Sequence, residues 1–244
     1  MKTDRKDKII VALDDPDLRR TEKLLEALSP HVNTFTIGLG LATAVGPNRL
    51  VSLVHSFGAK VLYDGKFHDT PDQVAVAARE IARLGVAMFT VHASGGYEMM
   101  KAAVANKGES KVLAVTVLTS LSETHARIIY GVPDDLPFDL KVIDFAHGAQ
   151  HVGVDGLICS PREVAMLNAE RVLKPMVKIV ATPGVRPEWA PRDDQKRVMT
   201  PREAKKAGAT VLVIGRPITR PPEAIGTPVD ALKRILEELE ESVG

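Results

Sequence analysis

Short runs of branched apolar residues alternate with stretches of helical length along almost the whole chain. Runs rich in valine, isoleucine and leucine are typical of buried strands, and eight of them cover residues 8–13, 34–37, 59–64, 87–92, 112–117, 156–158, 177–180 and 211–214. Amphipathic patterns between the runs predict helices, for example over residues 71–84, 201–207 and 228–239. Eight β–α units in 244 residues are the inventory of an α/β protein with the (β/α)8 TIM barrel fold. We therefore expect one barrel domain over residues 1–244.

A doubly wound open sheet is the alternative fold for this pattern. Sheets of that kind that bind dinucleotides carry a Gly-x-Gly-x-x-Gly motif directly after the first strand. Here the first apolar run ends in Leu13-Asp14-Asp15-Pro16. This difference favours the barrel.

The composition excludes several classes of partner. Aromatic residues make up only 4% of the chain, so the core must be aliphatic. The formal charge of +1, from 32 basic and 31 acidic residues, gives no overall attraction to nucleic acid or to an anionic membrane. We expect neither as a partner, and any anion site must be local.

Cysteine usage and the N-terminal segment bear on the compartment. The single cysteine, Cys159, excludes an internal disulfide, and its apolar neighbours predict a buried structural thiol. Residues 1–8 are charged and lead into the first apolar run without a signal core, and no later stretch has the length of a membrane span. We expect a cytoplasmic protein.

The third apolar run ends in a cluster of opposite charges, Asp64-Gly65-Lys66-Phe67-His68-Asp69. Side chains two residues apart in a strand face the same way, roughly 7 Å apart. We therefore expect Asp64 and Lys66 to project together from the strand tip, with Asp69 beyond it in the turn. Charges brought together in this way cost free energy unless a function uses them, which makes the cluster a catalytic candidate.

The last two predicted strands end in loops that are suited to an anion. Barrels of this class carry their chemistry at the C-terminal ends of the strands, and phosphate commonly binds at the loops after the seventh and eighth. Those loops contain Arg186 and Arg216, which offer bidentate donors, and Gly184 and Gly215, which allow close approach of the backbone. Together they predict a phosphate site.

Seven motifs follow one another along nearly the whole chain: Asp64-x-Lys66-x-x-Asp69 with Pro71, Val91-His92-Ala93-Ser94-Gly95-Gly96, Leu118-Thr119-Ser120, Asp155-Gly156-Leu157-Ile158-Cys159-Ser160, Thr182-Pro183-Gly184-Val185-Arg186-Pro187, Asp193-Asp194-Gln195-Lys196-Arg197 and Ile214-Gly215-Arg216-Pro217-Ile218. In this combination the chain resembles the bacterial orotidine 5'-phosphate decarboxylases. The first motif is shared with sugar-phosphate decarboxylases and hexulose-phosphate synthases of the same superfamily. The fifth and sixth resemble the orotidylate enzymes more narrowly.

The resemblance implies decarboxylation of orotidine 5'-phosphate to UMP and CO2, the last step of pyrimidine nucleotide synthesis, without a cofactor or metal. It implies that Lys66 delivers a proton to C6 of the pyrimidine and that Asp64 lies beside the substrate carboxylate. It further implies a homodimer in which Asp69 enters the neighbouring subunit's site. The substrate-binding residues would be Asp14, Thr36, Thr119, Pro183, Arg186, Gln195, Gly215 and Arg216. The stretch 185–198 is the candidate lid.

Four positions depart from the family pattern, and two of them, Thr70 and Gln73, lie in the turn expected to cross to the partner subunit. A lysine normally precedes the glycine of the second strand, but this chain reads Thr36-Ile37-Gly38, and Gly65 stands where a large apolar residue is common. Threonine supplies a hydroxyl without charge, so we expect weakened turnover.

Two alternatives to the decarboxylase stay open. One is a metal-dependent sugar-phosphate decarboxylase or aldolase of the same superfamily, against which Thr36 counts because that class has a metal-binding glutamate there. The other is a non-catalytic barrel that binds UMP.

Overall fold

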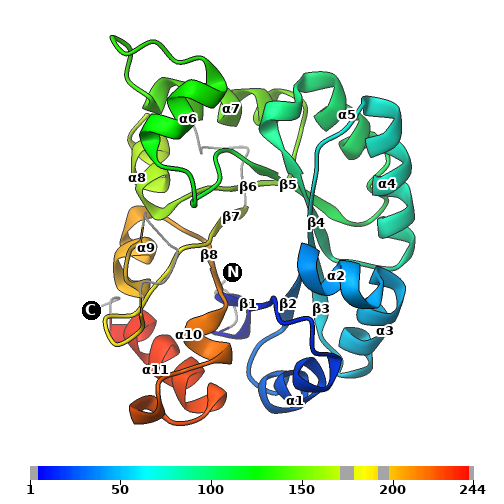
Figure 1. The fold of residues 1–244 in the computed structure, drawn as a ribbon, viewed down its shortest axis with the longest axis vertical. Helices are drawn as coiled ribbons and strands as arrows, with labels where there is room; N and C mark the ends of the chain where they lie inside the picture. The colour runs from blue at the N-terminus through cyan, green and yellow to red at the C-terminus, as the bar shows by residue number, and fades with distance from the viewer. Residues whose placement is uncertain (1–4, 171–178, 192–197, 242–244) are drawn as a thin grey trace.

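The computed structural model describes residues 5–170, 179–191 and 198–241. Within these ranges eight parallel strands pair in chain order, and the last pairs with the first, which closes the barrel (Figure 1). The strands are β1 (Ile9–Leu13), β2 (Thr34–Gly38), β3 (Lys60–Phe67), β4 (Met88–His92), β5 (Lys111–Val115), β6 (Gly156–Ile158), β7 (Ile179–Thr182) and β8 (Val211–Ile214). The TIM barrel predicted from the alternation of runs is confirmed.

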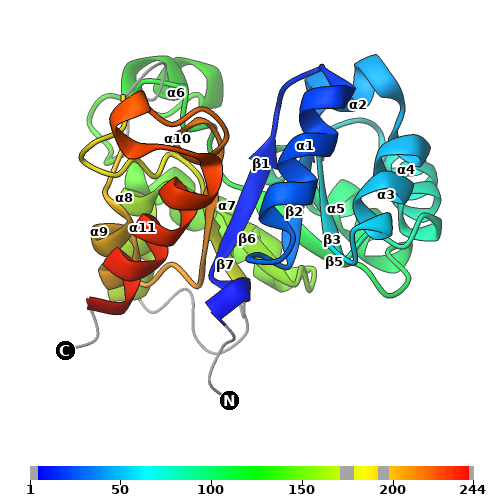
Figure 2. The same cartoon turned by 90° about the horizontal axis from the view of Figure 1, so that it is seen from below.

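Helices surround the barrel and also cover part of one end. They are α1 (Leu18–Leu28), α2 (Leu39–Val45), α3 (Pro47–Ser56), α4 (Pro71–Arg83), α5 (Tyr97–Ala105), α6 (Glu123–Tyr130), α7 (Asp139–His151), α8 (Pro161–Ala169), α9 (Pro201–Ala207), α10 (Arg216–Thr219) and α11 (Pro228–Glu241), with 3-10 turns at Arg5–Asp7, Ala93–Gly95 and Glu223–Ile225. Figure 2 shows α2, α6 and α10 together at the end of the barrel where the strands finish. That end is the one that faces the viewer in Figure 1.

The three helices predicted by residue range are present as α4, α9 and α11. Proline occupies the first turn of α4 and α9, where its missing N–H is not needed. Helix α9 also begins with a capping box, in which Thr200 and Glu203 satisfy each other's backbone N–H groups. None of the helices in the described ranges combines the length and hydropathy that a membrane crossing requires.

The barrel separates two apolar cores. The inner one is made by buried aliphatic side chains from six of the strands, namely Ile10, Leu62, Leu113, Val115, Ile158, Ala181 and Val211. The outer one lies between strands and helices and is mostly aliphatic, although Phe35 and Phe89 are fully buried in it. The expectation of an aliphatic core is thus confirmed, and the small inner core leaves the mouth of the barrel open to polar groups.

Several strand ends differ from the sequence prediction. Strand β3 continues to Phe67 instead of ending at Asp64, and β5 ends at Val115, two residues early. Strand β7 continues to Thr182, while residues 177 and 178 of its predicted start lie outside the described ranges. The extension of β3 has a tertiary cause, because its last residues pair with β4 after a register shift.

A buried carboxylate fixes the ends of β5 and β6. Glu163 is 4% exposed, and its Oε2 accepts hydrogen bonds from the Thr116 hydroxyl at 2.9 Å and the Ser160 backbone N–H at 3.1 Å. Ser160 in turn caps α8. Because an unpaired buried carboxylate is costly, these bonds hold the two strand ends together beside the barrel mouth.

Candidate active site

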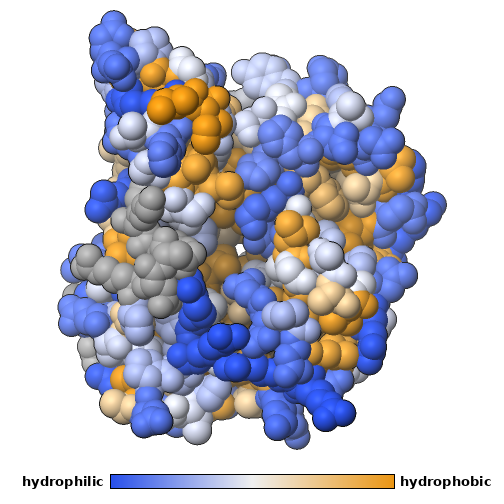
Figure 3. All heavy atoms as spheres, in the orientation of Figure 1, coloured by the Kyte–Doolittle hydropathy of each residue, from blue (hydrophilic) through white to orange (hydrophobic). Residues whose placement is uncertain are grey.

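A cavity of about 140 Å³ opens among the C-terminal ends of the strands. Five of the predicted site residues line it, namely Thr36, Asp64, Lys66, Thr119 and Pro183. The remaining lining residues are apolar apart from Cys159, whose buried position matches its predicted structural role. Figure 3 shows a hollow in the middle of this face, with strongly hydrophilic residues gathered below it, over α10 and toward α1.

The charged pair predicted from the third run is formed. Lys66 Nζ donates to Asp64 Oδ2 at 2.5 Å, and the two side chains are 35% and 23% exposed. The Thr90 hydroxyl on β4 donates to Asp64 Oδ1 at 2.9 Å and accepts the backbone N–H of Lys66, also at 2.9 Å. Thr90 is fully buried, so one sheltered hydroxyl fixes both members of the pair.

The local geometry differs from the regular strand that the sequence suggested. Tyr63 pairs with Phe89 and Phe67 with Val91, so that three residues of β3 stand opposite the single residue Thr90. This is a bulge, a feature that commonly re-aims side chains next to active sites. Lys66 adopts φ +46°, in the left-handed region that non-glycine residues seldom occupy. The pair therefore meets through a bent backbone and not through the two-residue repeat of a strand.

The unusual glycine at position 65 has a packing reason. A Cβ placed on Gly65 would lie 2.5 Å from Tyr63 Cε1 and 3.0 Å from Phe67 Cε1. These rings belong to a packed series in which the Tyr63 and Phe67 centroids are 6.0 Å apart and those of Phe67 and Phe89 are 5.7 Å apart. The aromatic rings fill the space that a large residue at position 65 would need.

Asp14 stands at the rim, directly after β1. Its Oδ1 lies 2.6 Å from the position of a Cβ on Gly38, and its Oδ2 lies 3.4 Å from that of a Cβ on Gly215, so the carboxylate sits between the ends of β2 and β8. The residue is accessible to solvent, but the crowded rim desolvates its carboxyl, which raises the pKa of Asp14 above the ordinary value of 3.8. The Asp64 carboxylate raises this pKa further, whereas Lys66 and Arg216 lower it. These four charges therefore share one electrostatic site.

The two arginines predicted to bind phosphate have different surroundings. Arg216 is exposed at the start of α10, beside Gly215. Arg186 is 8% exposed, and its Nη1 donates to the Val185 carbonyl at 3.1 Å, so it is packed within the loop after β7. Direct phosphate binding by Arg186 stays a prediction, and its burial is typical of a side chain that supports a loop.

The predicted residue Asp69 does not line the cavity. Asp69 is exposed in the turn after β3, where its Oδ1 accepts the Thr70 backbone N–H at 2.6 Å. Gln195 lies outside the described residues, as do the other residues of 192–197 in the candidate lid. The described ends of that stretch are held together, because Val185 bridges Met199 and the Arg186 N–H donates to the Met199 carbonyl at 2.9 Å.

A histidine pair adjoins the charged residues. The rings of His68 and His92 are 5.4 Å apart, and His92 Nδ1 is buried with no hydrogen-bond partner among the described residues. Desolvation lowers the pKa of His92, and the neighbouring His68 and Lys66 lower it further. His92 is thus held neutral beside the site.

Sequence comparison places the chain in a known family. A profile of the orotidine 5'-phosphate decarboxylase / HUMPS family matches residues 7–235, which is nearly the whole chain. The chain belongs to this family.

Relatives within the orotidine 5'-phosphate decarboxylase / HUMPS family match it over nearly their full length. An orotidine 5'-phosphate decarboxylase of Moorella thermoacetica is 45% identical over 96% of this chain and 93% of its own. One of Geotalea daltonii is 44% identical over 95% of each chain. The crystal structure of orotidine 5'-phosphate decarboxylase from Lactobacillus acidophilus superposes with a TM-score of 0.76 at 33% identity, over 95% of this chain and 98% of that one.

Thr90 contacts both Asp64 and Lys66 but is not among the site residues predicted from the sequence. The available signal was a lone hydroxyl in the apolar strand Met88–His92, but only the bulge opposite it gives that hydroxyl its two partners. Among the described residues, no group of three or more His, Cys, Asp or Glu side chains is arranged to hold a metal ion.

The raised pKa of Asp14 predicts a stability gain on neutralisation. The folded protein holds this proton at higher pH than the unfolded chain does, so ionised Asp14 costs stability above its folded pKa. We expect Asp14→Asn to have a larger free energy of unfolding than the original protein at pH 7. The gain should shrink as the pH falls through the raised pKa and disappear below 3.8. Urea unfolding at a series of pH values measures it.

Asp15 provides the matched control. A hydrogen bond from the Asp17 backbone and one from Arg220 lower the pKa of Asp15, so its ionised form stabilises the fold and Asp15→Asn should lose stability at pH 7. If Asp14→Asn and Asp15→Asn both raised the free energy of unfolding at pH 7, or both lowered it, this electrostatic description of the rim would be contradicted.

Proposed function

We propose that the chain catalyses decarboxylation of orotidine 5'-phosphate to UMP and CO2, the last step of pyrimidine nucleotide synthesis, with its own side chains supplying the chemistry. One observation carries the proposal: the Lys66 ammonium lines a cavity at the C-terminal ends of the strands in a barrel of this family. It donates a hydrogen bond to Asp64 at 2.5 Å. The relatives from Moorella thermoacetica and Geotalea daltonii are orotidine 5'-phosphate decarboxylases, which supports the same reaction.

Lys66 meets the chemical difficulty of the reaction. Loss of CO2 from C6 leaves carbanion character on a ring that has no adjacent electron sink, so a cation fixed at that carbon stabilises the transition state and can then deliver the proton. A preorganised charge in a site of low polarity acts far more strongly than the same charge in water. Thr90 and Asp64 provide the preorganisation, since they hold the backbone and the ammonium of Lys66 respectively.

The remaining residues would orient the substrate around that point. Asp14 would bind ribose hydroxyls, and Thr119 and Pro183 would face the pyrimidine from the cavity wall. Arg216 and Gly215 at the end of β8 would bind the phosphate, with Gln195 from the neighbouring loop. Binding energy from a non-reacting phosphate can offset the cost of desolvating the reacting group.

The first test measures turnover directly. Purified protein is mixed with orotidine 5'-phosphate, and loss of the orotate absorbance is followed with and without a chelator. We expect turnover that the chelator does not change. Lys66→Met should lower kcat by about a thousandfold or more, whereas Lys60→Met, at the exposed start of the same strand, should retain it.

The other outcomes identify the alternatives. Turnover of a sugar phosphate that the chelator abolishes would indicate the metal-dependent class of the superfamily. Tight UMP binding without CO2 release would indicate a non-catalytic barrel. Either result would overturn the proposal.

Asp69 belongs to a second element of the proposal, a homodimer with shared active sites. Asp69 is exposed and does not line the cavity of its own chain, although it follows Lys66 by only three residues. A position in the turn after β3 is suited to a residue that enters a neighbouring subunit's site. The dimer would then contain two sites, each built from both chains.

Hybrid dimers test this arrangement. Asp69→Ala and Lys66→Ala subunits are each expected to be inactive alone. Mixed and allowed to exchange, they should regain up to about half of the activity per hybrid dimer, because one of its two sites is intact. The activity of mixtures at varied ratios measures the effect. If the mixtures stay inactive although subunits exchange, Asp69 acts in its own chain's site.

Thr36 leaves the site with one cation fewer than the family pattern. It is 2% exposed and lines the cavity together with Asp64 and Lys66. Its hydroxyl cannot supply the charge that a lysine would bring to Asp64. We therefore infer that turnover is lower than in relatives that have the lysine.

Substitution of this threonine provides the corresponding prediction. Thr36→Lys should raise kcat/KM about tenfold, the scale of one charge-assisted hydrogen bond. Thr36→Met is the control, because methionine is similar in length to lysine but has no charge. It should give no increase in kcat/KM. Steady-state kinetics on both variants decides, and an equal or lower rate for Thr36→Lys would count against a missing cation.

A further inference from the structure

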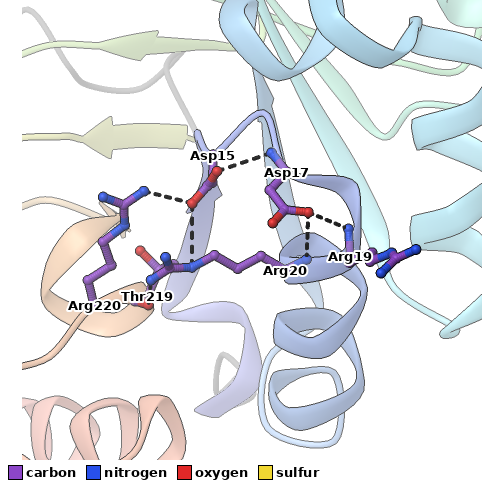
Figure 4. A network of polar contacts seen from close by, with 6 residues as sticks. All are labelled: Asp15, Asp17, Arg19, Arg20, Thr219 and Arg220. Atoms are coloured by element: carbon purple, nitrogen blue, oxygen red, sulfur yellow. Dashed lines mark hydrogen bonds and ion pairs between the residues drawn. The ribbon is translucent and has the colours of Figure 1, made fainter.

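Three charged residues join the loop after β1 to the turn after β8 (Figure 4). Asp15 Oδ2 accepts a hydrogen bond from Arg220 Nη2 at 2.6 Å and lies 3.4 Å from Arg20 Nε. Arg20 Nη2 also donates to the Thr219 carbonyl at 3.5 Å, and Asp15 Oδ1 accepts the Asp17 backbone N–H at 3.1 Å. We call Asp15, Arg20 and Arg220 the Asp15 bridge.

The bridge holds the short helix that presents Arg216. Helix α10 is a single turn, in which Arg220 N–H donates to the Arg216 carbonyl at 2.8 Å and Thr219 N–H donates to the Gly215 carbonyl at 3.0 Å. One helical turn is not stable by itself and depends on its tertiary contacts. The turn is held by the fully buried side chain of Ile218 and, at its C-terminal end, by the bond of Arg220 to Asp15. Fixing Arg220 and Thr219 therefore fixes the backbone of Arg216.

The Asp15 bridge also adjoins Asp14 at the rim of the barrel. Asp15 directly follows Asp14, whose carboxylate contacts the position of Gly215 at the start of α10. Asp14, Asp15 and Arg216 line one cavity of about 330 Å³, together with Leu13, Arg20, Thr21, Leu24, Thr219 and Arg220. Asp15 is the sheltered member of the bridge, 18% exposed against 43% for Arg20 and 54% for Arg220. It thus connects the two elements that carry Asp14 and Arg216.

We propose that Asp15 is a positioning residue that sets the place of Arg216 relative to Asp14 by anchoring α10 through Arg220 and Arg20. This inference rests on the proposed function, in which Arg216 binds the substrate phosphate. In this role Asp15 acts on the substrate through Arg216.

A positioning role for Asp15 and a purely electrostatic role predict opposite effects of its neutralisation on the affinity for phosphate. A carboxylate beside a phosphate site repels the phosphate, so its neutralisation would by charge alone tighten binding. If Asp15 positions Arg216, its neutralisation releases α10 and weakens binding. An exposed ion pair of no consequence would change nothing.

Asp15→Asn is the deciding variant. Its amide oxygen still accepts the Asp17 N–H, so the loop that begins α1 is retained. We expect the Kd of UMP and the KM of orotidine 5'-phosphate to rise roughly threefold to tenfold, with a smaller change in kcat. Affinity for uridine, measured as competitive inhibition, should stay unchanged because uridine has no phosphate.

A double variant and a control complete the experiment. Asp15→Asn combined with Arg220→Gln should bind UMP no more weakly than the weaker of the two single variants, since both break the same contact. Arg19→Gln is the control. It removes one positive charge, as Arg220→Gln does, from the first turn of α1 beside Arg20. The Arg19 side chain points away from the bridge in Figure 4. This variant should leave the Kd of UMP unchanged within twofold.

The results separate failure of this inference from failure of the proposed function. Unchanged or tighter UMP binding by Asp15→Asn overturns the positioning role, and so does an equal loss of affinity for UMP and uridine. Arg216→Gln tests the underlying assignment: if it leaves UMP binding unchanged, the phosphate is not at Arg216. If Arg216→Gln weakens UMP binding while Asp15→Asn does not, only the bridge inference fails.

Discussion

The charged pair at the barrel mouth depends on a backbone conformation that lysine seldom adopts. A left-handed residue costs roughly 1–2 kcal/mol for an L-amino acid, and at Lys66 this cost is met by the bond from its N–H to Thr90. Thr90 belongs to a different strand, so the bond that stabilises this conformation forms when β3 and β4 are paired. The chemistry proposed for Lys66 is thus a property of the closed barrel and not of the local sequence.

Barrel closure has a wider effect on the rim. Pairing of β8 with β1 brings residue 216 next to residue 14, and the carboxylate of Asp14 then sits between two glycines that leave room for it. Desolvation there opposes ionisation of Asp14, while Lys66 and Arg216 favour it. Ionised Asp14 is therefore an unfavourable charge in the free protein, and in the proposed function the ribose hydroxyls of the substrate would use it. Storage of unfavourable interactions at a binding site is a common trade between stability and function.

The sequence predicted the architecture well because periodicity is a local property. Eight apolar runs, three helices and the meeting of Asp64 with Lys66 were all predicted from residues close in the chain. The bulge in β3 was not, since it arises from the pairing of Tyr63 and Phe67 with β4. Thr90 lies 24 residues from Lys66, and the Asp15–Arg220 contact spans 205 residues. Such contacts leave no periodic signal in a single sequence.

Gly65 shows how one local choice limits the surrounding sequence. The rings of Tyr63 and Phe67 occupy the volume that a side chain at position 65 would fill. The three positions therefore share a fixed amount of space, and growth at one is compatible with the fold only when another shrinks. A larger residue introduced at position 65 alone would collide with these rings, and a smaller residue at position 63 would relieve the nearest of the contacts.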